Sequence, residues 1–299
     1  MALYAIILVV CSALLHAGWN ILGKSNGGSG YSFTLGAALA PLILLSPYLL
    51  WCLAVIGVDN LSAKFWGLLL LSAIGQVIYL VGLLKAYNLG DIGVMYPIAR
   101  ALPVLMVGLG TVVIGQTLTV NAWFGFAVLT LGCLIIPMRH FTDLRLSSYA
   151  NVGVFWALIA AIGTTIYSIV DKQTLSWIQL ETDGLSSHQI AIFFLGMQFA
   201  AIAIVLITWL LLTGKRHELA LTWQYRYRSA TAGIMMALTY GMVLFAMTMV
   251  DNVSYVVALR QVSIIFGVLM GIWFLNEKWF YTRGVGVSLV LAGLIIALA

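Results

Sequence analysis

Charged side chains are scarce in this sequence. Only 8% of its 299 residues are Asp, Glu, Lys or Arg, whereas 63% are hydrophobic, and the mean hydropathy is +1.09. A water-soluble domain of this length could not cover its surface with so few polar groups. The composition therefore excludes a soluble protein and indicates an integral membrane protein whose first partner is the lipid bilayer.

Cysteines are few and the histidines are not clustered. Cys11, Cys52 and Cys133 all fall within apolar runs, where a thiol usually acts as a small hydrophobic side chain. We therefore expect no disulfide framework, no metal site and no cofactor. The formal net charge of +5 could indicate nucleic acid. The basic residues lie mainly in short connections between apolar runs, however, as the positive-inside pattern requires, so we expect no nucleic-acid partner.

The apolar runs are each about twenty residues long, which is the length that an α-helix needs to cross about 30 Å of hydrocarbon. Strands of a membrane barrel would instead alternate over about ten residues. The first run has no basic segment before it and no clear cleavage site after it, so we interpret it as a span and not as a cleaved signal peptide. The sequence predicts ten transmembrane helices, at residues 3–23, 33–56, 65–88, 92–114, 120–138, 150–171, 188–213, 229–250, 253–275 and 281–298.

The second half of the chain can be aligned with the first. A shift of about 160 residues matches Asp251 to Asp91 and Arg260 to Arg100, and each arginine follows its aspartate by nine residues. Because each half holds five predicted spans and five is odd, the second copy must enter the membrane in the opposite orientation. The predicted fold class is all-α integral membrane, with a first five-helix repeat at 1–138, a linker at 139–149 and an inverted second repeat at 150–299.

Lysine and arginine are distributed unevenly between the two sides of this predicted topology. One side has only Lys64 and Lys172. Because basic loops stay in the cytoplasm, we expect the other side to be cytoplasmic and both termini to lie outside, in the cell inner (cytoplasmic) membrane. The basic side collects Lys24, Arg139, Arg145, Lys215, Arg216, Arg226, Arg228, Lys278 and Arg283.

Three short segments stand out within and between the predicted spans. They are the Leu14-Leu15-His16-Ala17-Gly18-Trp19-Asn20 segment, the hairpin from Lys85-Ala86-Tyr87 to Tyr96-Pro97-Ile98-Ala99-Arg100, and the Leu275-Asn276-Glu277-Lys278 turn. Together with two inverted five-span repeats, they resemble the EamA-type transporters of the drug/metabolite transporter superfamily. The resemblance extends over essentially the whole chain, and it implies a fold and a transport class but little about the transported molecule. The chain departs from the family pattern at Gly115-Gln116, where many relatives carry an acidic Gly-Glu pair, so no role is assigned to Gln116.

Ionisable residues inside predicted spans are candidates for substrate binding, because each costs a few kcal/mol to insert. His16 lies well inside the first span. Arg100 and Arg260 each lie roughly 13 Å beyond their aspartate, close to the middle of the membrane. Lys85 lies within about a turn of the end of its span, where snorkelling to the interface is the alternative. The alternative for the arginines is a structural ion pair or a carbonyl clamp, and for His16 a packing hydrogen bond.

Acidic residues are absent from the centre of every predicted span, because Asp91, Asp171, Asp251 and Glu277 all fall at span ends. A site for an organic cation, or a multidrug site coupled to protons, would need a buried carboxylate. The basic set instead suits a carboxylate, phosphonate or phosphate, which arginine binds through two parallel hydrogen bonds. A zwitterion such as an amino acid also fits, with its ammonium group held by carbonyls or aromatic faces.

Aromatic and neutral polar residues complete the predicted site, with Tyr87 and Gln198 beside it. The predicted substrate-binding residues are His16, Trp19, Asn20, Tyr79, Lys85, Tyr96, Arg100, Tyr167, Ser168, Tyr240, Tyr255, Arg260 and Gln261. Pro97 and Pro103 lack the N–H that continues a helix, so we expect the fourth span to kink on either side of Arg100. The predicted gating residues, in the hairpins of spans three–four and eight–nine, are Asp91, Pro97, Pro103 and Asp251.

The sequence thus predicts a secondary transporter of a small polar metabolite, anionic or zwitterionic, and not an enzyme. Coupling to protons through His16, which titrates near neutral pH, and exchange against a counter-substrate fit equally well. The alternatives are an exporter of cationic or hydrophobic drugs, favoured by the aromatic content, and a membrane enzyme. The enzyme alternative lacks a catalytic cluster, because His140, His188 and His217 lie apart. We expect a monomer or a weak homodimer.

Overall fold

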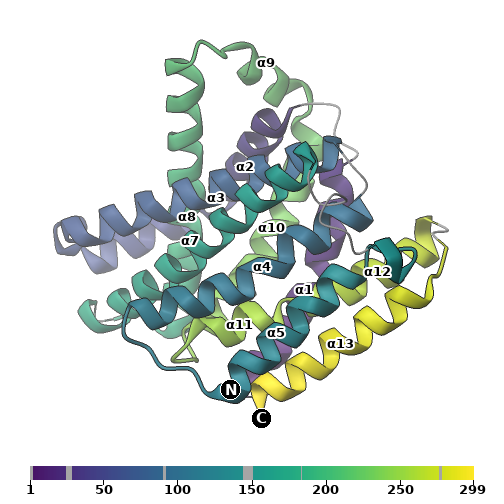
Figure 1. Cartoon of the computed structure of the whole chain (residues 1–299). Coiled ribbons are helices and arrows are strands. Elements are labelled where there is room, and N and C mark those ends of the chain that lie inside the picture. Colours follow the sequence, from purple (N-terminus) through teal and green to yellow (C-terminus); the bar gives the residue numbers. More distant parts are fainter. Residues whose placement is uncertain (1–2, 25–28, 90–91, 144–150, 183, 276–277) are drawn as a thin grey trace.

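The chain folds into α-helices joined by short connections (Figure 1). The computed structural model describes residues 3–24, 29–89, 92–143, 151–182, 184–275 and 278–299. The helices are α1 (Leu3–Lys24), α2 (Gly30–Ile56), α3 (Ala63–Leu89), α4 (Ile92–Val113), α5 (Val120–Ile135), α7 (Val152–Glu181), α8 (Ser187–Leu212), α9 (His217–Gln224), α10 (Arg226–Met247), α11 (Val253–Leu259), α12 (Val262–Leu275) and α13 (Tyr281–Leu298), with 3-10 turns η1 (Val58–Asn60) and η2 (Phe141–Asp143).

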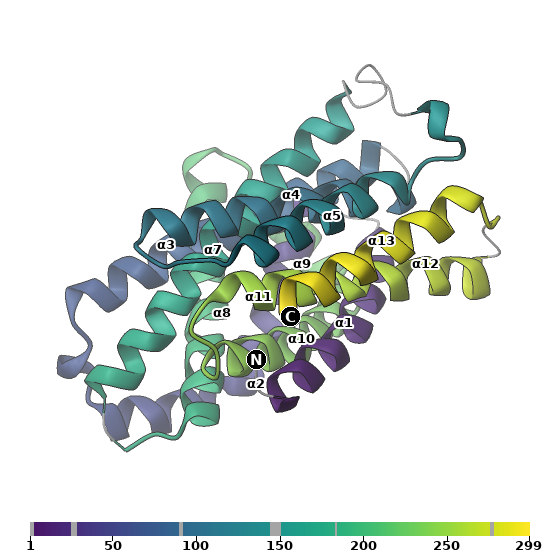
Figure 2. The same ribbon diagram turned by 60° about the horizontal axis from the view of Figure 1, so that its bottom comes forward.

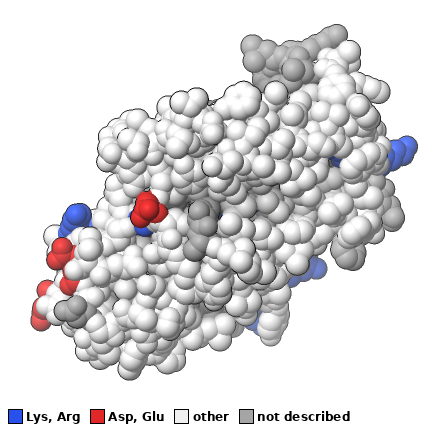
Figure 3. Space-filling model, turned by 90° about the horizontal axis from the view of Figure 1, so that it is seen from below, with Lys and Arg blue, Asp and Glu red and all other residues white. Residues whose placement is uncertain are grey.

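The long helices are apolar on their outer faces. Within the described residues, eight helical stretches are long and apolar enough to cross a membrane, and the apolar parts of α4 (Ile98–Val113) and α5 are shorter. A broad uncharged surface covers the face drawn in Figure 3, with the acidic groups toward one end and basic groups at both ends. Exposed Leu, Ile, Val and Trp side chains favour hydrocarbon over water. The prediction of an all-α integral membrane protein is therefore confirmed, and the chain is a multi-pass protein in contact with lipid.

Helices that are distant in the sequence pack side by side. The main pairs are α3 with α7, α5 with α13, α10 with α1 and α4 with α7, followed by α2 with α8 and with α10. Figure 2 shows α5 and α13 running alongside one another. Glycines permit the close approach. A Cβ on Gly163 would lie 2.5 Å from the Tyr79 amide nitrogen, and one on Gly125 would lie 2.5 Å from the Ala297 amide nitrogen. The backbones of α3 and α7, and of α5 and α13, are therefore in direct contact.

The helix α7 extends well beyond the predicted span, from its Asn151 N-cap to Glu181. Asp171 consequently lies inside the helix, ten residues before its end, and the prediction that it falls at a span end was wrong. The polar run that begins at Asp171 lowers the local hydropathy without ending the helix, because Asp171 and Thr174 are fully buried while Gln173 points outward. The predicted span ended at Asp171 because polar residues on the inner face of a helix lower the local hydropathy in the same way as the end of a span does.

The partner of the fourth span is interrupted, which the sequence did not predict. Helix α4 is continuous through Pro97 and Pro103. The predicted span 253–275 is divided into α11 and α12, with Arg260 and Gln261 in a turn between them. Neither proline nor glycine marks this turn, so local sequence rules could not locate it. The interruption brings the Arg260 side chain to the centre of the helix bundle.

Candidate functional site

A cavity lies among α1, α3, α7, α8 and α10, beside the turn between α11 and α12. It has about 50 Å³ that the centre of a water molecule can occupy. One water needs roughly 10–15 Å³ by this measure, so the cavity is narrow, and a metabolite would have to displace side chains to enter. The lining residues are His16, Trp19, Gln76, Tyr79, Leu80, Tyr167, Leu195, Gln198, Phe199, Ile202, Met236, Thr239, Tyr240 and Arg260.

Arg260 provides the positive charge of this cavity and is only 3% exposed. Its Nη1 and Nη2 atoms both donate to the Tyr167 hydroxyl oxygen at 3.4 Å, which is long for a hydrogen bond. No carboxylate of the described residues lies within ion-pair distance of it. A guanidinium carries five N–H donors, so one distant phenol leaves capacity for a further acceptor. The geometry is that of a buried cation able to receive an anion.

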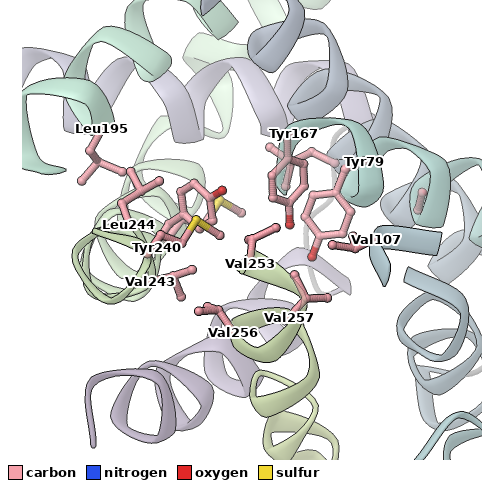
Figure 4. Packing of buried hydrophobic residues seen from close by; sticks show 14 of the residues in the cluster. Tyr79, Val107, Tyr167, Leu195, Tyr240, Val243, Leu244, Val253, Val256 and Val257 are labelled. Carbon is pink, nitrogen blue, oxygen red and sulfur yellow. The ribbon is translucent and has the colours of Figure 1, made fainter. Parts of the chain in front are cut away.

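Three tyrosines surround the Arg260 guanidinium. Tyr79 and Tyr167 stand side by side with ring centroids 5.6 Å apart, and the Tyr240 ring meets Tyr167 edge-on at 5.6 Å (Figure 4). The Arg260 Cζ atom lies 5.4 Å from the Tyr240 centroid and 6.0 Å from that of Tyr167. Aromatic faces attract cations through their quadrupole, so these rings stabilise the buried charge without neutralising it. The close α3–α7 crossing is what brings Tyr79 and Tyr167 together.

His16 also lines the cavity, and residues of its own helix hold it in place. The Trp19 indole Nε1 donates to His16 Nδ1 at 3.2 Å, and an accepting nitrogen carries no proton, so the imidazole is neutral in this arrangement. Asn20 fixes the helix in place, because its Nδ2 donates to the His16 carbonyl at 2.6 Å and its Oδ1 accepts from the Tyr87 hydroxyl at 2.7 Å. Asn20 is therefore a positioning residue outside the cavity lining.

Arg100 does not line the cavity. It is 1% exposed, and its Nη2 donates to the Arg260 backbone carbonyl at 3.3 Å and to the Ser263 hydroxyl at 3.0 Å. The Arg260 carbonyl lies in the interruption between α11 and α12, where the regular helical hydrogen bonds are disturbed, and Ser263 lies in the first turn of α12. Arg100 is the carbonyl clamp that the sequence analysis retained as its alternative.

Lys85 also lies away from the cavity, near the end of α3. Its Nζ lies 4.0 Å from the ring centroid of Trp156 and 5.3 Å from that of Tyr31. Lys215 Nζ lies 4.7 Å from the same Tyr31 centroid. We call Tyr31, Lys85, Trp156 and Lys215 the lysine–aromatic cluster. It lies where α2, α7 and α10 begin and α3 and α8 end, at one end of the bundle.

The remaining predicted residues are dispersed. Ser168 is buried, Gln261 Nε2 donates to the Val257 carbonyl at 3.0 Å, and the Tyr255 ring packs edge-on against Phe126 at 6.2 Å. Pro103 is buried in α4. Asp91 and the side chains of Tyr96 and Pro97 lie outside the described residues.

Asp251 borders a second cavity, of about 600 Å³, at the end of the bundle where α3 begins and α7 ends. The Asp251 side chain is exposed, and its backbone carbonyl accepts from Gln116 Nε2 at 3.3 Å. The other ionisable residues of this cavity are Lys64, Lys172 and Glu181. The cavity is polar and open, in contrast to the aromatic cavity around Arg260.

A buried carboxylate, which the sequence analysis did not expect, lies directly behind the wall of the first cavity. Asp171 is 0% exposed; the Ser72 hydroxyl donates to its Oδ1 and the Tyr240 hydroxyl to its Oδ2. Gln198 Nε2 in turn donates to Ser72 Oγ at 2.7 Å. Tyr240 and Gln198 face the cavity, whereas Asp171 does not. The site therefore holds a cation on its wall and an anion one side chain further out.

Neutral polar groups that the prediction omitted, or mentioned only in passing, also face the cavity. Gln198 Oε1 and Thr239 Oγ1 are buried and have no hydrogen-bond partner among the described residues. Gln76, like Gln198, could have been noticed as an isolated amide within an apolar run, but Thr239 follows a typical membrane-helix pattern. Buried polar atoms without partners are costly, so these groups suit a polar ligand.

Fold and site together define a class of protein: a multi-pass helical membrane protein with a central aromatic cavity that contains a buried arginine. A solved structure described as "Crystal structure of protein" is similar, with a TM-score of 0.67 and 13% sequence identity over 98% of this chain and 96% of that chain. At this identity the likeness shows the fold alone. No family model matches the sequence, and no curated protein matches it.

Proposed function

We propose that the chain is a secondary transporter of a small polar metabolite, an anion or a zwitterion, which it moves across the cytoplasmic membrane by alternating access. The observation that carries this proposal is the buried Arg260 guanidinium on the cavity wall, with no carboxylate partner among the described residues. A carboxylate or phosphonate would supply the missing acceptors through two parallel hydrogen bonds. For a zwitterion, Gln198 Oε1 and Thr239 Oγ1 are acceptors for the ammonium group.

The packing of the helices supports the further proposal of an EamA-type transporter with ten spans in two inverted repeats. If α1 to α5 correspond to α7, α8, α10, α11–α12 and α13, the contacts of α3 with α7 and of α10 with α1 are equivalent. The pairs α5 with α13 and α2 with α8 then join corresponding helices. Substrate sites of inverted-repeat transporters lie at the repeat interface, and this cavity takes residues from both halves.

The distribution of charge supports the proposed orientation. The lysine–aromatic cluster lies at the end of the bundle that collects most of the basic residues, and the second cavity lies at the other end. By the positive-inside rule the lysine–aromatic cluster is cytoplasmic, and the second cavity is the outer vestibule. A reporter that is active only in the cytosol and is fused to Ala299 should remain inactive; strong activity would reverse this orientation.

A ligand screen tests the proposed function directly. Purified protein is heated in the presence of carboxylates, phosphonates, amino acids and organic cations, alongside Arg260→Gln and the exposed-loop control Arg216→Gln. We expect compounds with a negative group to raise the melting temperature of the wild type and of Arg216→Gln, but not of Arg260→Gln. Proteoliposome counterflow with a radiolabelled hit then tests transport. Stabilisation by cations alone would overturn the proposal.

The aromatic lining favours an exporter of cationic or hydrophobic drugs as a second candidate. Trp19, Tyr79 and Tyr167 offer faces to which an organic cation can bind. The nearby carboxylate of Asp171 gives this candidate weaker support, because both its oxygens already accept hydrogen bonds from Ser72 and Tyr240. Stabilisation by organic cations that persists in Arg260→Gln would favour this candidate over the first.

A further inference from the structure

The carboxylate of Asp171 has no counterion at contact distance. It is completely buried, and no Lys, Arg or His nitrogen of the described residues lies within 4.0 Å of it. Its carboxylate oxygens accept hydrogen bonds from the hydroxyl groups of Ser72 and Tyr240. An ionised carboxylate in such surroundings costs several kcal/mol unless a positive charge lies close enough to compensate for it.

The nearby positive charge is that of Arg260, and Tyr240 joins the two groups. The Tyr240 hydroxyl donates to Asp171 Oδ2, while the Arg260 Cζ atom lies 5.4 Å from the centroid of the same ring. Arg260 therefore stabilises the Asp171 anion across one aromatic ring. An anionic ligand on the guanidinium would cancel that stabilisation, because one cation would then serve two anions.

We propose that Asp171 is a proton-binding site that is occupied when an anion binds at Arg260 and is vacated when the anion leaves. The inference rests on the proposed function and names its coupling ion. Without ligand, the ionised Asp171 and Arg260 balance each other in charge. With ligand, the carboxylate takes up one proton, so that the anion and the proton cross together and the site keeps its net charge.

The surrounding groups are consistent with this exchange. Of the titratable and charged groups on the elements that pack against α7, those facing the Asp171 region are Tyr79 from α3, Tyr240 from α10 and Arg260 after α11. On α7 itself, Tyr167 contacts Arg260, and Lys172 Nζ donates to the Met247 carbonyl at 3.1 Å. Arg100 on α4 is engaged at the Arg260 carbonyl. No competing carboxylate stands among them.

The hydrogen bonds also allow either protonation state. Ser72 Oγ is both donor and acceptor, so it can donate to the ionised carboxylate and turn to accept from the protonated one. Gln198 Nε2 donates to the same Ser72 oxygen in the ionised arrangement. Because Gln198 lines the cavity, the hydrogen bonds through Gln198 and Ser72 form a second connection between a bound ligand and the protonation state of Asp171, besides the one through Arg260.

Infrared difference spectroscopy tests proton binding without any ligand. The protein in lipid nanodiscs is titrated between about pH 4 and pH 9 while the carbonyl-stretch band of protonated carboxylic acids is followed. As the pH rises, we expect the wild type to lose the carbonyl band of a buried carboxylic acid. Asp171→Asn should lack this band at every pH. An identical band change in Asp171→Asn, or its absence from the wild type, would overturn the proposal.

Methanesulfonate tests the link to Arg260, because it stays ionised over this whole range and any pH dependence must come from the protein. Saturating methanesulfonate should move the loss of the band to higher pH, and neutral dimethyl sulfone should not. Linkage of one proton predicts that the affinity of the wild type for methanesulfonate falls about tenfold per pH unit between the midpoint without ligand and the higher midpoint with ligand. Asp171→Asn should bind with no such dependence. A band unaffected by methanesulfonate would overturn the coupling.

A second variant covers the case in which Asp171→Asn does not fold. Tyr240→Phe keeps the carboxylate and loses one donor to it, so the same band should titrate at higher pH. An unchanged midpoint would argue against Asp171 as its source. The two proposals fail separately: an Asp171-dependent band without anion counterflow would reject the transport proposal, and counterflow without that band would reject the proton site.

Discussion

Arg100 donates a hydrogen bond to the backbone carbonyl of Arg260, across 160 positions of sequence. The two arginines occupy matching places in the two halves, yet they differ in their tasks. Arg100 holds the interruption between α11 and α12, and Arg260 extends from that interruption into the cavity. A fixed arginine therefore positions the one that faces the cavity.

Replacing the clamp should lower stability. Arg100→Gln removes hydrogen bonds from a buried charged donor to the Arg260 carbonyl and the Ser263 hydroxyl. We expect a loss of about 2 kcal/mol in the free energy of unfolding, against roughly 1 kcal/mol for Ser263→Ala, which removes one of the two. Denaturant unfolding in detergent micelles measures both. Equal stability of Arg100→Gln and wild type would contradict the clamp.

A lysine should not replace Arg260. The ammonium group of Arg260→Lys keeps the charge but cannot present two parallel N–H donors to one carboxylate. We expect roughly tenfold weaker binding of the anion found in the ligand screen, with a melting temperature close to wild type, as determined by calorimetric titration. Wild-type affinity in Arg260→Lys would mean that charge alone is recognised.

The α3–α7 crossing should not tolerate an added methyl group. In Gly163→Ala the new Cβ would lie 2.5 Å from the Tyr79 amide nitrogen and 2.7 Å from the Gly75 carbonyl oxygen. The helices would separate, at a cost of about 1–3 kcal/mol and with displacement of Tyr79. Gly67→Ala on α3 is the matched control, because nothing lies within 4 Å of its added Cβ and it should gain about 0.5–1 kcal/mol in unfolding free energy. Thermal unfolding that ranks the two equally would contradict the close crossing.

Lys85 should prove separable from the ligand site. Lys85→Gln removes the cation that sits 4.0 Å from the Trp156 ring centroid, so we expect a loss of about 1 kcal/mol in stability. Ligand affinity, measured by the same titration, should stay within about twofold of wild type, because 1.4 kcal/mol corresponds to a tenfold change and no contact to the cavity is lost. A large loss of affinity at unchanged stability would instead mean that Lys85 contacts the ligand.

The class of fold could be predicted from the sequence because the bilayer fixes the length and apolarity of a helix in lipid. The ends and interruptions of the helices were harder to predict. The extension of α7 past Asp171 depends on Ser72 and Tyr240, which satisfy its carboxylate from two other helices. The interruption at Arg260 depends on Arg100 in the same way. Both features are set by tertiary contacts, which local hydropathy does not contain.

The candidate site was predicted in part for a related reason. Of the residues predicted to bind the substrate, those that line one cavity are His16, Trp19, Tyr79, Tyr167, Tyr240 and Arg260. The sequence could not distinguish Arg260 from Arg100, because both follow an aspartate by nine residues and the direction of each side chain depends on its helix face. The contribution of α8 to the cavity was not predicted, because Leu195, Phe199 and Ile202 resemble ordinary lipid-facing residues.

The α5–α13 pair limits how the bundle can rearrange. On this pair, an added Cβ at Gly125 or Gly132 would lie 2.5 to 2.7 Å from backbone atoms of the facing helix, so the two helices interlock at backbone distance. Sliding or twisting one against the other would force backbone atoms into overlap at successive turns. The two helices α5 and α13 therefore stay packed as one rigid unit. Any opening of the cavity to either side of the membrane must come from other helices that move relative to this unit.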